Sequence, residues 1–142
     1  MPLAIVLAED NATIRKMLRA SLAELANVEV IAEAEIAGEA IAALAAHAGS
    51  WQLAVLGLFL REGHALDVLR AAAETRPGQR IFVLTNYATP EIRRRALAAG
   101  ADAVFDKSTE LDEFFAACQA SSVAQGRSFV KRGLLCCPAR ET

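Results

Sequence analysis

The stretch that decides the fold is Leu53-Ala-Val-Leu-Gly-Leu-Phe-Leu-Arg-Glu-Gly63. It begins as an unbroken apolar run and ends in a polar loop. A short apolar run bounded by glycine and charged residues is typical of a strand buried on both faces in the middle of a parallel sheet. The stretch therefore predicts a central strand with helices packed against both of its sides.

Three other apolar runs also end in polar side chains. They are Leu3–Ala8 before Glu9 and Asp10, Ile81–Leu84 before Thr85, and Ala103–Phe105 before Asp106 and Lys107. In an open α/β sheet, sites form at the carboxyl ends of the strands. We therefore expect two acids, a hydroxyl and an ammonium group to converge near the end of the Leu53 strand. The residue that they would surround is Gly57, which has no side chain.

The segments between these strands carry helical signals. The first predicted helix follows Asn11 and has Arg15, Lys16 and Arg19 on its outer side. The second and third span 36–48 and 66–74. The fourth begins at Thr89-Pro90, and the fifth begins after a cap at Ser108 or Thr109. Residues 28–34 alternate in polarity, which favours a less buried strand at a sheet edge. Five strands alternating with five helices predict an α/β fold, a doubly wound parallel sheet with helices on both faces.

Length and composition set the other bounds. The 142 residues fit one domain, which we place at 1–125, followed by a tail at 126–142 to which we assign no structure. A net charge of −2 makes nucleic acid an unlikely partner. The first residues resemble neither a signal peptide nor a membrane span, and three cysteines fit reduced thiols, so we expect a cytoplasmic protein.

The polar residues at the strand ends suggest phosphate chemistry. Carboxylate oxygens such as those of Glu9 and Asp10 suit Mg²⁺. The alternative for this acid pair is a favourable interaction with the positive end of the following helix. A metal, the Thr85 hydroxyl and the Lys107 ammonium would together form a site for a phosphoryl group.

In these residues the chain resembles the receiver domains of two-component response regulators, over residues 3–124. The matching stretches are Leu3–Asp10, Leu53–Gly63, Val83–Thr85, Ala98–Asp102 and Phe105–Lys107. The resemblance implies the flavodoxin-like, CheY-like sheet order 2-1-3-4-5. It also implies a signalling module that is not an enzyme, in which Thr85 and Phe105 form the switch.

One residue departs from that family at its centre. Receivers have a phosphorylatable Asp where this chain has Gly57, and usually a Pro where Arg61 stands. Glycine can neither accept a phosphoryl group nor bind a metal through a side chain. We therefore expect no phosphorylation by the usual route and weakened Mg²⁺ binding, to which a backbone carbonyl near Phe59 could still contribute. We also expect Lys107 to pair with Asp10 and partly replace the metal.

Partners and alternatives follow from the same resemblance. It implies a sensor histidine kinase or another two-component protein as partner, and a face of the fourth helix, fifth strand and fifth helix that could form a homodimer. On that face, the run Arg93–Arg95 reads as a solvated helix surface more readily than as a site for an acidic partner. An ordinary receiver carrying an Asp-to-Gly substitution at Gly57 stays open. A small flavodoxin-like enzyme is disfavoured, because Glu9-Asp10-Asn11 stands where a phosphate loop would be.

Overall fold

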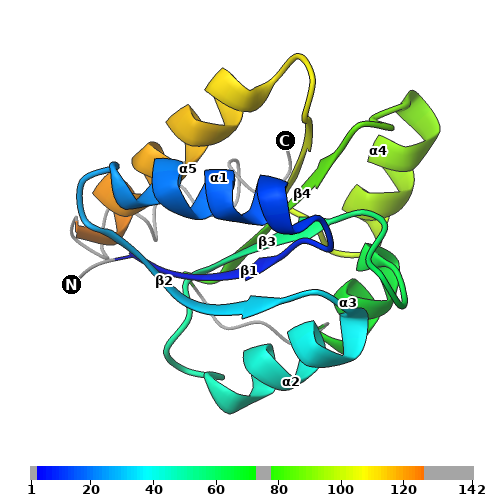
Figure 1. Cartoon of the computed structure of the whole chain (residues 1–142), viewed down its shortest axis with the longest axis horizontal. Helices are drawn as coiled ribbons and strands as arrows, with labels where there is room; N and C mark the ends of the chain where they lie inside the picture. The colour runs from blue at the N-terminus through cyan, green and yellow to red at the C-terminus, as the bar shows by residue number, and fades with distance from the viewer. Residues whose placement is uncertain (1–2, 73–77, 127–142) are drawn as a thin grey trace.

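The apolar runs form the strands of one parallel sheet in a computed structural model, which describes residues 3–72 and 78–126 (Figure 1). The strands are β1 (Leu3–Ala8), β2 (Val28–Ala34), β3 (Leu53–Gly57), β4 (Arg80–Thr85) and β5 (Ala103–Asp106). Their order is β2-β1-β3-β4-β5, which confirms the predicted order. β3 is buried along its whole length, whereas β2 lies at the edge and is only partly covered. Nearly all of the predicted tail lies outside the described residues.

In the part of the chain that the structure describes, five helices cover the two faces of the sheet. They are α1 (Ala12–Ala23), α2 (Ala37–Ala46), α3 (Ala65–Ala71), α4 (Pro90–Ala98) and α5 (Leu111–Gly126). Leu18 and Leu22 of α1 and Phe114 and Cys118 of α5 pack on one face of the sheet. The second apolar core contains buried residues of α2, α3 and α4 on the opposite face, and the ribbon shows the same division (Figure 1).

Two of the three predicted helix caps form. The side chain of Asn11 accepts a hydrogen bond from the backbone N–H of Ile14 at 2.9 Å, and Thr89 caps α4 in the same way. The cap predicted for α5 at Ser108 or Thr109 was wrong. The N–H of Phe114 donates to the carbonyl of Glu110, which stands directly before the helix, while Ser108 donates to Asp106.

The loop after β3 depends on a glycine. Gly63 has a φ of +91°, a conformation that L side chains rarely adopt. A Cβ atom at this position would also lie 2.5 Å from the Cβ of Ala37 in α2. The neighbouring N–H of Ala37 donates to the carbonyl of Glu62 at 2.8 Å. Close backbone contact therefore holds this loop against the start of α2, beside the end of β3.

None of the helices among residues 3–72 and 78–126 is both long enough and apolar enough to cross a membrane.

Candidate functional site

The parallel register brings the predicted site residues to one edge of the sheet. Ala8 pairs with Leu56, and Gly57 pairs with Leu84 on the other side of β3. Thr85 pairs with Asp106 of β5. The residues that follow β1, β3 and β5 therefore meet around Gly57, as the strand ends predict.

Glu9 is the central acid of this site. Its side chain is only 2% exposed. Its Oε1 accepts a hydrogen bond from Nζ of Lys107 at 2.8 Å, and its Oε2 accepts one from the backbone N–H of Asn11 at 3.1 Å. Asp10, by contrast, is exposed. The predicted pairing of Lys107 with Asp10 was therefore wrong: β1 carries Glu9 inward, and the chain then turns Asp10 toward water.

Gly57 lies in contact with this ion pair. A Cβ atom at position 57 would be 3.1 Å from Oε1 of Glu9 and 3.4 Å from the carbonyl oxygen of Ala8. The first distance is tighter than ordinary van der Waals contact between a Cβ and a neighbour, so a larger residue would require Glu9 to shift. The carboxylate of Glu9 thus sits beside the space that a side chain at position 57 would enter, and it engages Lys107 from there.

Arg15 holds the backbone of the same acid. The prediction placed Arg15 on the outer side of α1, but its side chain is only 15% exposed. One guanidinium nitrogen donates to the carbonyl of Glu9 at 2.8 Å, and the others pair with Glu33 at 3.2 Å and Glu35 at 3.0 Å. The sequence signal for these ion pairs is the presence of Glu33 and Glu35 at the end of the edge strand β2. That strand lies beside α1.

Thr85 and Phe105 occupy the neighbouring strand ends. Thr85 is buried, and its Oγ1 accepts a hydrogen bond from the backbone N–H of Tyr87 at 2.9 Å. The ring of Phe105 packs edge-on against Phe82, at a centroid distance of 5.4 Å, and against Phe114, at 5.7 Å. The hydroxyl is thus tied to the loop after β4, and the aromatic ring packs inward.

An aromatic cluster stands beside the site. Phe59 is 53% exposed and Tyr87 is 60% exposed, and their rings meet edge-on with centroids 5.6 Å apart. His64, which caps α3, packs edge-on against Phe59 at 5.1 Å. Partial burial lowers the pKa of His64, and the neighbouring Asp67 opposes that effect. Phe59 was considered in the sequence only for its backbone, so the exposed ring was missed.

The acids around Gly57 do not form a metal cluster. Within the described ranges, no group of three or more His, Cys, Asp and Glu side chains could hold a metal ion. Both carboxylate oxygens of Glu9 already accept hydrogen bonds, one of them from a cation. The donor set, as arranged, therefore suits an internal ammonium group better than a divalent ion.

Comparisons with known proteins agree with this geometry. The response regulator receiver domain family matches residues 5–119. Over 109 residues the chain is 33% identical to the uncharacterized transcriptional regulatory protein YhcZ of Bacillus subtilis (strain 168). That match covers 77% of this chain and 50% of the relative, so the chain spans about half the length of the curated relative.

Solved structures share the fold. The signal receiver domain of NarL from Mycobacterium tuberculosis superposes with a TM-score of 0.76 at 22% identity, covering 89% of this chain and 98% of that one. The REC domain of AraT, a response regulator from Geobacillus stearothermophilus, gives 0.71 at 24% identity, covering 89% and 100%. At these identities the likeness shows the fold alone. The family match covers residues 5–119, and the site at the strand ends agrees with it. This chain therefore belongs to the response regulator receiver domain family of two-component systems.

Proposed function

We propose that this chain is a receiver module that signals through protein contacts without accepting a phosphoryl group. In this proposal Gly57 occupies the phosphoacceptor position, and it offers no nucleophile. The observation that carries the proposal is the contact between Glu9 and Lys107, at 2.8 Å, beside the glycine. The lysine that would neutralise a phosphoryl group is thereby paired with an internal carboxylate. Receiver domains are signalling modules and not enzymes, which counts against the flavodoxin-like enzyme.

The same arrangement bears on metal binding. Receiver domains typically bind Mg²⁺ at the phosphorylation site. Here Glu9 and Asp10 would be the carboxylate ligands, with the backbone near Phe59. Glu9 is committed to Lys107 and Asn11, and Gly57 adds no carboxylate, so these residues do not fit the ion as they stand. We propose that Mg²⁺ binding is weakened and that the ammonium of Lys107 supplies the positive charge in its place.

The partner class follows from the family. Receiver domains interact with histidine kinases and other two-component proteins. We propose a partner of this class for the face formed by α4, β5 and α5, which includes Phe105 and could also pair two copies of the chain. Thr85, Phe105 and Lys107 form the switch site of this proposal, although no phosphoryl group reaches it.

Intact-mass measurement tests the missing acceptor directly. The protein, a Gly57→Asp variant and a Gly57→Asn control are incubated with Mg²⁺ and a small-molecule phosphodonor. We expect only the Asp variant to gain the mass of one phosphoryl group, because only it has a carboxylate nucleophile at position 57. Asn has nearly the same shape as Asp without the charge. Label on the protein with Gly57 would identify another acceptor and refute the proposal.

Thermal unfolding of the same three proteins tests the metal. A ligand that binds only the folded state stabilises it by about 2.7 kcal/mol at a hundred times its Kd. We expect millimolar Mg²⁺ to raise the melting temperature of the Asp variant and to leave the glycine protein and the Asn control nearly unchanged. An equal rise in all three would show that position 57 does not govern metal binding.

A further inference from the structure

Helix α4 has little apolar attachment to the rest of the domain. Ala96 is its only fully buried residue, and Ile92 is half-buried against the core. Leu97, the largest other apolar side chain of the helix, is 45% exposed. A nine-residue helix is too short to be stable by itself, so its position depends on its tertiary contacts. The few apolar contacts leave room for polar contacts to decide where the helix sits.

Arg93 supplies such contacts from the side of α4 that faces β5. Its Nε donates to the carbonyl of Ala88 in the loop before the helix, at 3.0 Å. One terminal nitrogen donates to the carbonyl of Val104 in β5 at 3.0 Å, and the other donates to Oε1 of Glu110 at 2.8 Å. A single guanidinium group thus joins the β4–α4 loop, β5 and the residue before α5. We refer to Arg93, these two carbonyls and Glu110 as the Arg93 clamp.

Glu110 extends the clamp into the β5–α5 loop. Its Oε1 also accepts the backbone N–H of Asp106 at 2.8 Å, and its own N–H donates to the carbonyl of Asp106 at 2.8 Å. The hydrogen bond from Arg93, followed by that from Asp106, holds the pKa of Glu110 below its usual value, so the group is ionised at neutral pH. Because hydrogen bonds to charged groups are stronger than neutral ones, this junction is a charge-assisted contact that ties α4 to the β5–α5 loop.

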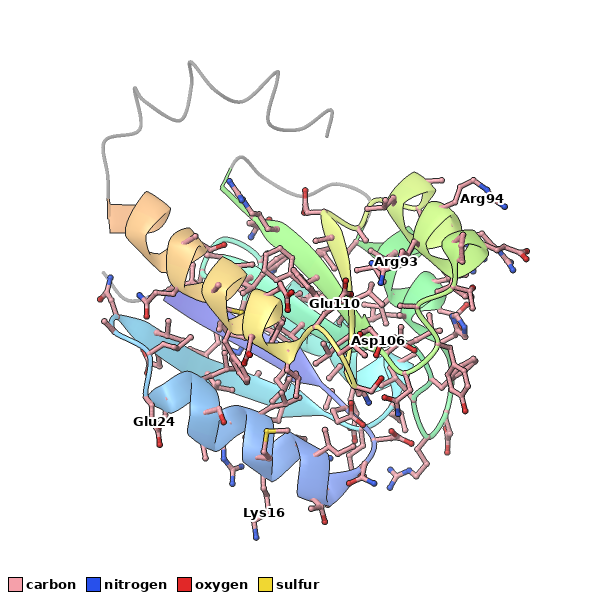
Figure 2. All side chains as sticks on the ribbon, turned by 90° about the horizontal axis from the view of Figure 1, so that it is seen from above. Lys16, Glu24, Arg93, Arg94, Asp106 and Glu110 are labelled. Carbon is pink, nitrogen blue, oxygen red and sulfur yellow. The ribbon has the colours of Figure 1, made fainter. Side chains whose placement is uncertain are left out.

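The neighbouring arginines of the run do not take part. Figure 2 shows Arg93 directed toward Glu110 and Asp106, and Arg94 pointing away from the domain. Arg95 lies 3.9 Å from Glu91 on the same helix, and both side chains are more than half exposed. The run of three arginines therefore contains one inward residue, one that pairs along the helix surface and one that is solvated.

The clamp spans the two loops that flank the switch residues. Thr85 precedes the β4–α4 loop, and its Oγ1 accepts the N–H of Tyr87 within that loop. Phe105 lies between Val104 and Asp106, both of which contact the clamp, and its ring packs inward against Phe114. We infer that the Arg93 clamp holds the face of α4, β5 and α5 in one preset arrangement, with Phe105 packed inward, and that this face needs no phosphoryl signal to adopt it. The independence of this face from phosphorylation rests on the proposed function, whereas the clamp itself does not.

Amide hydrogen exchange of the unphosphorylated full chain tests the clamp. The variants are Arg93→Ala, Glu110→Ala and the double variant, with Arg94→Ala as the matched control on the same helix. We expect Arg93→Ala to accelerate exchange of the α4 amides and of the Asp106 amide by about tenfold or more, while the amides of β1 and β3 keep their rates. The Arg94→Ala control should match the unmodified protein throughout.

The double variant separates a clamp from two independent contacts. If Arg93 and Glu110 act as one unit, the double variant should exchange about as fast as the faster single variant, since the second change removes nothing further. Unchanged α4 exchange in Arg93→Ala would overturn the inference, and so would an equal acceleration in β1 and β3, which would indicate general destabilisation. Exchange is measured without phosphodonor, so this result does not depend on the mass experiment at Gly57.

Discussion

Nζ of Lys107 and Oε1 of Glu9 lie 2.8 Å apart in a site where the glutamate side chain is only 2% exposed. Removing one member of a buried ion pair leaves an uncompensated charge, which costs more than the pair itself contributes. The contact therefore makes Lys107 a structural residue in this chain.

Replacement of Lys107 by methionine should reveal that role. We expect Lys107→Met to lower the free energy of unfolding by about 3 kcal/mol, because the charge of Glu9 would stay buried without its partner. Urea unfolding at neutral pH measures the change. Lys16→Met is the control, since Lys16 is exposed on α1 and points into solvent (Figure 2), and it should shift stability by no more than about 0.5 kcal/mol.

A companion variant isolates the unpaired charge as the cause. Adding Glu9→Gln to Lys107→Met removes the charge and should recover part of the lost stability. If Lys107→Met unfolded at the same urea concentration as Lys16→Met, the ion pair would contribute nothing measurable.

The choice between Glu9 and Asp10 marks the limit of sequence reasoning at this scale. Adjacent acids at a strand end are equivalent in the sequence, and only the path of the backbone decides which points inward.

The same limit holds for the run Arg93, Arg94 and Arg95. Their burial follows from the rotation of α4 about its axis, which Ile92 and Ala96 fix by packing on the core. Arg93 stands beside Ile92 and three residues before Ala96, and that spacing was the available signal.

At the scale of elements, two glycines near α2 offer a matched pair of substitutions. Gly63→Ala should destabilise the protein by about 3 kcal/mol, from the left-handed backbone together with the contact with Ala37. Gly38 lies within α2, and a Cβ there would meet nothing within 4 Å. Gly38→Ala should therefore stabilise by about 0.5 kcal/mol through helix propensity. Thermal and urea unfolding compare the two.

Opposite signs are the decisive outcome of that comparison. A loss at both positions would mean that α2 tolerates no added methyl group at its start. A neutral result at Gly63 would mean that the β3–α3 loop moves away from α2 at little cost.

Element identities followed from periodicity, but several helix boundaries did not: α2 spans Ala37–Ala46 instead of 36–48, and α3 spans Ala65–Ala71 instead of 66–74. The strands are apolar runs of the right length, and their alternation with helices leaves few topologies. The start of α5 was misjudged because Ser108 and Thr109 are good capping residues by type, yet the side-chain hydroxyl of Ser108 donates to the carboxylate of Asp106 in the loop. Competition between local hydrogen bonds of this kind is set by tertiary geometry.

For the whole molecule, acid should weaken the domain through the β5–α5 loop. Hydrogen bonds from the side chain and backbone of Ser108 lower the pKa of Asp106, and those from Arg93 and Asp106 lower the pKa of Glu110. A depressed pKa contributes stability that is complete above the unfolded value and is lost as the pH falls toward the folded value. For Glu110 the loss begins below its ordinary pKa of 4.5.

Unfolding midpoints at several pH values check this expectation. Between about pH 6 and about pH 3 the urea midpoint should fall, and Glu110→Gln should fall less steeply because it has no proton to take up. Glu113→Gln, an exposed position in the first turn of α5, should keep the slope of the unmodified protein. Identical slopes in all three proteins would show that Glu110 is not a source of the acid sensitivity.

The overall architecture was predictable because it depends on many residues at once. A buried β3, an edge strand with alternating polarity and four polar strand ends agree on one fold, so an error in one helix boundary does not change it. The site is different, because it depends on individual side-chain directions. The sequence predicted that Glu9 and Lys107 would lie near Gly57, but not that they would pair with each other.

The contact between Glu9 and the space at Gly57 has a consequence for how the gene can change. Some glycine codons become aspartate codons through a single nucleotide change, so this substitution is genetically accessible where such a codon stands. Here a Cβ at position 57 would lie 3.1 Å from a carboxylate oxygen that is bound to Lys107. An aspartate at this position would have to displace that oxygen and place a second negative charge beside it. The ion pair therefore opposes an aspartate at position 57, whatever the genetic code permits.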